Sequence, residues 1–313
     1  MVRLILRRIA ISIPLIFVVS MLVFALQSLS PTDPAQALLG TGGTQEQLEA
    51  LREKLGLNLP LWQQYLNYMS HVLQGDFMSS YRTGTPVTTL IADRLPVTLA
   101  LIILGVLVGT VVGVALGTAS AIRGGFFGKL LDFVSLAGLA LPNFWLGLAL
   151  VAVFAVTLHL LPSGGYVPFT QNPVGWALSL VLPVAALSLG GIATVAKTTR
   201  ESMLEVMNRD FIRTLRAAGL GGGSIIWKHG LKNAAIPVIS VVNLNFIGAL
   251  TGTVFVESVF VLPGLGSLVV SAVNGAEIQV LEGVALTFTI IVVIVNLLID
   301  ISYGWLNPKV RAA

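Results

Sequence analysis

Residues 197–237 read KTTRESMLEVMNRDFIRTLRAAGLGGGSIIWKHGLKNAAIP and differ sharply from the rest of the chain. Seven lysine and arginine side chains stand here against three carboxylates, and both ends of the stretch run into long apolar segments. The residue types favour short helices. A basic, helical insert of this size between two apolar segments predicts a loop on one side of a membrane that binds a soluble protein.

The rest of the chain is rich in apolar residues. Of its 313 residues, 55% are hydrophobic and 10% are charged, and the mean hydropathy is +0.90. A soluble protein of this length cannot bury so much apolar surface. A membrane span needs roughly 20 mostly apolar residues, and it must be helical here because lipid cannot satisfy exposed backbone groups. Six segments qualify, at residues 9–29, 95–122, 130–161, 176–196, 235–262 and 284–305.

These segments predict an all-α polytopic membrane protein with six transmembrane helices. We divide the chain into an N-terminal transmembrane helix at residues 1–30, an external helical segment at 31–93 and a five-helix core at 94–313. The core contains the polar loop, with bounds of 197–235.

Lysine and arginine are unevenly distributed between the two sides of the membrane. Six spans place both termini on the same side as the loop, and that side carries fourteen of the 18 cations. Because positively charged loops stay in the cytoplasm, both termini and the loop are expected there. The scattered cations are not interleaved with aromatic residues, so nucleic-acid binding is not expected.

The external segment carries two helix signals. Thr44-x-x-Gln47 is a capping-box pattern that starts a helix, and Gly56 ends it. Pro60 suits the first position of a second helix, which ends at Gly75. These helices either pack as a small cap on the membrane domain or form a docking surface for an external protein.

Small residues recur in the second predicted span. Gly105, Gly109, Gly113 and Gly117 follow one another at intervals of four residues. This spacing predicts close approach of another helix, within the chain or from another subunit.

The sequence lacks the motifs of catalysis and metal binding. It has no cysteine, and its three histidines are scattered. Residues 124–129 resemble a phosphate-binding loop, but Leu130 follows the lysine where the motif requires serine or threonine. We therefore predict no catalytic residues, no metal site and no cofactor in this chain.

Polar residues inside the apolar segments are candidates for a transport pathway. On the fifth span Ser240, Asn243, Thr251 and Ser258 fall on one helical face, and Glu257 lies near the external end. A polar stripe on a spanning helix faces protein or water. It either lines a translocation pathway or bridges neighbouring helices by hydrogen bonds.

A short amphipathic helix is predicted inside the polar loop, and Gly219 ends it. One face carries arginine side chains and another carries apolar ones. The residues concerned are Arg209, Asp210, Phe211, Ile212, Arg213, Leu215, Arg216, Ala217 and Gly219. Such a helix can lie on a membrane surface, fill a groove on a cytoplasmic protein, or form a solvated loop near acidic lipids.

The loop and much of the rest of the chain resemble a known protein family. The similarity covers nearly its whole length, and the residues that carry it are Arg7, Arg8, 31–34, Gly56, Leu57, Pro60, Gln64, Tyr65, Gly75, Asp76, 203–206, 210–214, Ala217, Gly219, Leu220, His229, Leu231, Asn233, Ala234, Pro237, 263–266, 296–300 and 307–311. Together they resemble permease subunits of bacterial ABC importers, most closely the dipeptide and oligopeptide group that includes nickel and glutathione importers. In that family the loop is called the EAA loop, and its short coupling helix inserts into a groove of the ATPase subunit.

Two departures from the family pattern are visible. Arg213 stands where the general pattern has glutamate, as in the peptide-importer variant, and residues 221–223 are glycines where a more polar turn is usual.

The resemblance implies the partners and the function. The chain would form half of the translocation pathway for peptides or similar small solutes, paired with a second homologous permease subunit in the bacterial inner membrane. Residues 209–213, 215–217 and 219 would couple it to two cytoplasmic ATPase subunits, which hold ATP and Mg²⁺, and an external substrate-binding protein would deliver the solute. Dipeptides, oligopeptides, glutathione and nickel chelates remain open as substrates. The alternative function is a self-sufficient secondary transporter that needs no ATPase.

The distribution of cations leads to a testable topology. Reporter fusions after Gly84 and Gly264 should read as external, and fusions after Gly222 and at the C-terminus should read as cytoplasmic. A cytoplasmic reading at Gly84 would reverse the topology.

Overall fold

The computed structural model describes residues 2–28, 33–126, 128, 130, 133, 138 and 141–306. These residues form helices joined by turns, with one isolated β-bridge between Ser79 and Pro86. The all-α prediction is confirmed. Of the residues that carry the family resemblance, 31, 32 and 307–311 lie outside the described ranges.

Five described helices are long and apolar enough to cross a membrane. Their apolar segments are Leu6–Leu26, Val87–Arg123, Pro173–Met207, Gly222–Val259 and Ile278–Ser302. The third predicted span, at residues 130–161, falls partly outside the described residues. Its described part is the shorter apolar helix Asn143–Thr157, so the count of six spans stays a prediction.

The chain divides into two compact units by its internal contacts. The first comprises residues 1–98 and 263–298, and the second comprises 99–262 and 299–313. Both units share helices α5 (Val87–Arg123) and α13 (Ile278–Leu306), each of which continues from one unit into the other. The domain bounds at residues 30 and 93 remain a prediction from the sequence.

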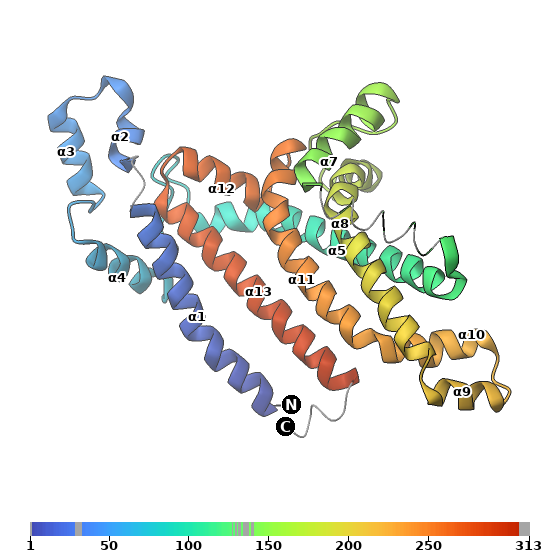
Figure 1. Ribbon diagram of the computed structural model, residues 1–313. Coiled ribbons are helices and arrows are strands. Elements are labelled where there is room, and N and C mark those ends of the chain that lie inside the picture. Colours follow the sequence, from blue (N-terminus) through green and yellow to red (C-terminus); the bar gives the residue numbers. More distant parts are fainter. Residues whose placement is uncertain are drawn as a thin grey trace. The chain divides into compact units, whose positions relative to one another are not determined.

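The first unit contains α1 (Val2–Ser28), the start of α5, α12 (Leu265–Asn274) and most of α13. Figure 1 shows α1 and α13 running side by side, and the hydroxyl of Ser20 on α1 donates to a carboxylate oxygen of Glu282 on α13, at 3.2 Å. Its apolar core consists of Val87, Ile91, Leu265, Leu268, Ala272, Val280, Leu281 and Val284.

The external segment folds as short helices in the same unit. They are α2 (Pro34–Leu39), the 3₁₀ turn η1 (Gly40–Gly42), α3 (Gln45–Lys54) and α4 (Leu61–Val72). The capping box is confirmed, because the Gln47 amide donates to the Thr44 hydroxyl at 3.3 Å and the Thr44 amide donates to the Gln47 side chain at 3.1 Å. Gly56 and Gly75 follow α3 and α4 with positive φ angles of 69° and 82°, which explains why glycine ends each helix.

The second unit is built around α8 (Pro173–Met207) and α11 (Leu231–Val259), with α7 (Asn143–Leu150) packed against both. A π-helical turn, η2 (Val151–Thr157), continues α7. Helix α8 extends eleven residues beyond the predicted end of its span at residue 196, so the first part of the predicted loop is a continuation of the transmembrane helix.

The glycine stripe of α5 packs against α8 in this unit. A Cβ added at Gly109 would lie 3.6 Å from the carbonyl carbon of Gly191, so the two backbones are neighbours. A Cβ added at Gly117 would lie 2.4 Å from the carbonyl oxygen of Ala196, closer than real side chains allow. The predicted close helix contact is therefore made within the chain.

Candidate functional site

The short helix in the polar loop is α9 (Asp210–Ala217), and it lies beyond the ends of α8 and α11 (Figure 1). Ile212 is fully buried, whereas Phe211 is exposed and Leu215 is half-buried. Helix α9 packs on the π-helical turn η3 (Ile225–Gly230), which leads into α11. Ile212 thus anchors the helix to its own chain, while Phe211 points outward.

The charged residues of α9 face solvent. The side chains of Asp210 and Arg213 are 94% and 75% exposed and approach each other to 3.4 Å. Arg209, which precedes the helix, pairs with Glu205 near the end of α8 at 2.6 Å. Each exposed ion pair of this kind contributes less than about 1 kcal/mol to folding stability, so these pairs orient the helix more than they stabilise it.

The C-terminal end of α9 is a Schellman motif. The Gly219 amide donates to the Arg216 carbonyl at 3.0 Å, and the Leu220 amide donates to the Leu215 carbonyl at 3.2 Å. Gly219 has a φ of +78°, and a Cβ placed there would meet nothing within 4 Å. The requirement for glycine is therefore conformational and not steric.

A hollow of about 540 Å³ lies behind α9, among the ends of α5, α8 and η3. Its lining combines apolar side chains with the polar groups of Arg216 and Asn208. The lining residues are Ala121, Ile122, Met203, Leu204, Met207, Asn208, Arg216, Leu220, Gly222, Ile225 and Ile226. Arg216 therefore borders this hollow, a position that the helical pattern alone did not reveal.

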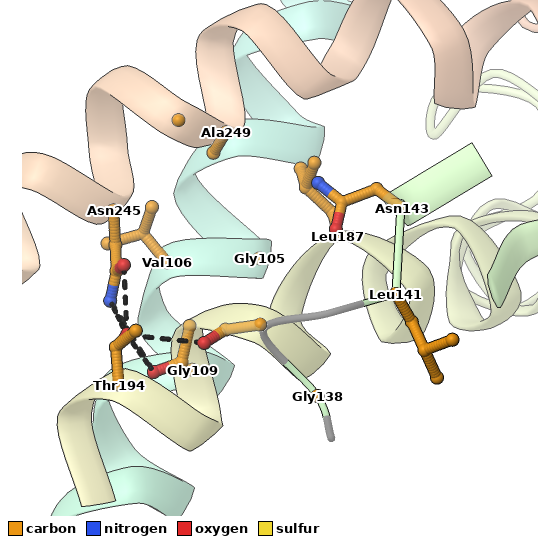
Figure 2. Close-up of a pocket in the computed structure, with 13 residues that line it drawn as sticks. Gly105, Val106, Gly109, Gly138, Leu141, Asn143, Leu187, Thr194, Asn245 and Ala249 are labelled. Carbon is orange, nitrogen blue, oxygen red and sulfur yellow. Dashed lines mark hydrogen bonds between the residues drawn. The ribbon is translucent and has the colours of Figure 1, made fainter. Parts of the chain in front are cut away.

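A second cavity, of about 210 Å³, lies where α5, α7, α8 and α11 meet (Figure 2). Its walls are largely glycine, from Gly105 and Gly109 on α5 and from Gly190 and Gly191 on α8. Side chains of Asn143, Thr194 and Asn245 supply its polar groups.

Thr194 and Asn245 form the polar centre of this cavity. The Asn245 side-chain amide donates to the Thr194 hydroxyl at 2.9 Å. The Thr194 hydroxyl in turn lies within hydrogen-bonding distance of two acceptors, the carbonyl oxygens of Gly191 at 3.0 Å and of Gly190 at 3.2 Å. A hydroxyl has a single proton, so it cannot satisfy both carbonyls and the Asn245 side-chain oxygen, also 3.0 Å away. The cluster keeps acceptor capacity for a polar group that enters.

The size of the cavity limits what it can hold. Sites for drug-sized ligands measure roughly 300–1,000 Å³, and this cavity is about 210 Å³. It suits water or one small polar group, not a whole peptide. Nothing in the sequence marks Asn245 or Thr194, because a lone asparagine or threonine in an apolar helix gives no signal until the partner helix is known.

The predicted polar stripe lies on another face of α11. Asn243 and Asn245 are two residues apart, which separates their directions by about 200° around a helix. The hydroxyls of Ser240, Thr251 and Ser258 are exposed on this chain, and each donates to the carbonyl four residues earlier, at 3.2, 3.2 and 2.8 Å. The stripe is thus separate from the cavity.

Glu257 and Asn243 differ from the hydroxyls of the stripe. Glu257 is fully buried, and Asn243 is half-buried. Neither residue lines the cavity of Figure 2. The structure therefore brings Ser240, Thr251 and Ser258 to the surface of the chain and leaves Glu257 inside it.

Comparison with known proteins gives a consistent result. Residues 109–312 match a family described as the inner membrane component of binding-protein-dependent transport systems, and residues 1–102 match the N-terminal part of such components. A relative from Brucella abortus (strain 2308) is 38% identical over 312 residues, 99% of each chain. The oligopeptide transport system permease protein AppB of Bacillus subtilis (strain 168) is 36% identical and covers 98% of each chain.

Two further similarities extend this result. The glutathione transport system permease protein GsiC of Escherichia coli O1:K1 / APEC is 34% identical over 99% of each chain. Among solved structures, a chain of the inward-facing MetNI methionine ABC transporter is similar with a TM-score of 0.57. That match covers 70% of this chain and 97% of the other at 18% identity, so it supports the fold alone.

The Schellman motif at the end of α9 leads to a prediction. Gly219→Val forces a β-branched residue into a left-handed conformation, which costs roughly 1–2 kcal/mol or more. It should fray the end of α9 and increase the rate of tryptic cleavage after Arg216. Gly221→Val is the matched control, because Gly221 has a φ of −62° and equally open surroundings. Equal cleavage rates in the two variants would show that the conformation of Gly219 does not hold the helix end.

Proposed function

This chain belongs to the family of binding-protein-dependent transport system inner membrane components, and from that premise we propose that it is the permease subunit of an importer for peptides or similar small solutes. Two of the relatives described above are named as oligopeptide and glutathione transport permeases, and each is similar to this chain over almost its full length. A dipeptide transport system permease protein of Alkalihalophilus pseudofirmus is 35% identical over 97% of this chain. Peptide-like solutes are the chemistry that these names share.

The permease works as part of a larger complex. It pairs with a second permease subunit and two cytoplasmic ATPase subunits, and an external binding protein delivers the solute. ATP and Mg²⁺ bind to the ATPase subunits. The chain is a multi-pass protein of the inner membrane, and we place both termini on the cytoplasmic side because of the cation distribution.

The observation that most directly supports coupling to an ATPase is the construction of α9. Its buried Ile212 and its ion pair to Glu205 tie it to the ends of α8 and α11, while Phe211 remains exposed. An exposed aromatic side chain on an anchored helix suits insertion into a groove of another protein. A movement of the ATPase groove would then be transmitted to two transmembrane helices.

The polar stripe of α11 is the proposed share of the translocation pathway. Ser240, Thr251 and Ser258 are exposed on the single chain, although they lie on a membrane-spanning helix. Each of these hydroxyls donates to its own helix and keeps lone pairs that can accept a hydrogen bond from a solute or a neighbouring subunit. We therefore place the solute between this face and the second permease subunit, with Asn243 at its border and the buried Glu257 near its external end.

This function is tested with the double variant Phe211→Ala/Leu215→Ala. Loss of two apolar anchors should weaken ATPase binding by on the order of 2 kcal/mol, about 30-fold in affinity. ATP-driven uptake by the reconstituted complex should fall with it. The measurements are co-purification of the ATPase subunits and substrate-stimulated ATP hydrolysis in vesicles.

Arg216→Ala provides the control for surface charge and should have a milder effect. Wild-type association and hydrolysis in the double variant would rule out α9 as the coupling element. Uptake by the permease without ATP would instead contradict the importer function itself.

A further inference from the structure

Helix α4 contacts α1 within the apolar segment of α1, before that segment ends. The Tyr65 hydroxyl donates to the Phe17 carbonyl at 3.3 Å, and the Tyr65 ring packs edge-on against Phe24 with ring centroids 5.6 Å apart. Both phenylalanines lie within the apolar segment Leu6–Leu26. They precede its end by two and nine residues, which corresponds to about 3–14 Å along a helix axis.

This depth matches that of an interfacial helix. Helices that lie in the plane of a membrane bury their apolar face roughly 5–10 Å below the headgroup boundary. Figure 1 shows α4 beside the C-terminal half of α1 and not beyond its end. The contact therefore places α4 at the level of the membrane surface.

One side of α4 carries an exposed apolar ridge, which consists of Trp62, Leu66 and Leu73. Their exposed fractions are 62%, 57% and 73%. At 100° per residue the three side chains point within about 40° of one another. The buried Tyr68 and Met69 and the half-buried Tyr65 lie along one flank of the ridge, between about 20° and 120° from Trp62 around the helix.

The opposite flank of α4 is covered by the backbone that connects α3 to α4. Gln64 lies about 200° from both Trp62 and Leu66 around the helix, and its side-chain amide donates to the carbonyls of Leu57 at 3.1 Å and Leu59 at 2.8 Å. The connection from α3 thus occupies the flank opposite the ridge. Because that connection leads to the external helices, the ridge points the other way, toward the membrane interior.

The composition of the ridge favours lipid over a protein partner. Residues 61–72 contain no lysine, arginine, aspartate or glutamate, so the helix offers no charges to steer or orient a soluble protein. Tryptophan is enriched at membrane interfaces. The side chains of Met21, Leu22 and Leu26 on α1 are apolar and exposed as well, so α1 offers lipid-facing surface at the same level.

We infer that α4 is an interfacial helix whose ridge of Trp62, Leu66 and Leu73 inserts between lipids of the leaflet nearest the C-terminal end of α1. The exposed Asn67, about 100° from Leu66 around the helix, then faces water. Helix α4 thereby fixes the height at which the external segment sits on the bilayer.

The experiment uses single spin labels, because the chain contains no cysteine. Leu66→Cys and Leu73→Cys report on the ridge, and Asn67→Cys is the control, because Asn67 is exposed and lies about 100° from Leu66 around the helix. Each variant is labelled in the complete transporter, with cysteine-free partner subunits, and reconstituted in phospholipid vesicles. The measurement is the collision rate of each nitroxide with oxygen, which partitions into lipid, and with a water-soluble nickel chelate.

The ratio of oxygen to nickel collisions should be severalfold higher at positions 66 and 73 than at 67. Equal ratios at 66 and 67 would show a water-facing ridge and overturn the inference. Protection of position 66 from both reagents would assign the ridge to a partner subunit. Immobilisation of the label at 66 on addition of the binding protein would assign it to docking. Either result would also contradict lipid insertion.

Discussion

Backbone contact between α5 and α8 is the interaction on which the membrane part of the second unit depends. Lipid tails are as apolar as leucine, so burial of apolar surface does not drive helices together inside a bilayer. Close packing and interhelical hydrogen bonds must hold them instead. Gly109 of α5 lies against Gly191 of α8, and Gly117 lies against the carbonyl of Ala196. At Gly117 no larger residue allows this approach.

The same contact positions the polar groups of α8. With α5 close behind it, α8 presents Thr194 toward Asn245 of α11, and glycines from both helices wall the small cavity between them. The hydrogen bond between Thr194 and Asn245 in turn links α8 to α11. Since α8 continues without a break to Met207, the packing inside the membrane also sets where this end of the helix lies. Helix α9 is attached at that end, so under the proposed coupling a movement of α9 would act on helices that are already packed together.

Local features were predictable from sequence, and pairings between helices were not. The capping box at Thr44, the glycine at position 219 and the apolar spans depend on neighbouring residues, and the described structure contains the first two and five of the six spans. Burial of Ile212 could not be predicted, because it depends on how η3 turns back onto α9. The hydrogen bond between Thr194 and Asn245 likewise depends on how α8 and α11 are rotated, since the two residues are 51 apart in sequence. Periodicity indicated a polar stripe on α11, but it could not show that a second polar feature lies on another face.

The central claim is that α5 and α8 meet backbone to backbone, and a comparison of Gly117→Ala with Gly109→Ala tests it most directly. Alanine adds the same methyl group at both positions and raises helix propensity equally, so the difference reports on space alone. The methyl group at 117 would lie 2.4 Å from the Ala196 carbonyl oxygen, whereas at 109 the nearest atoms are 3.6 Å away. Thermal unfolding of the purified permease should show destabilisation of roughly 1–3 kcal/mol for Gly117→Ala and little change for Gly109→Ala. Equal stability of the two variants would contradict the contact.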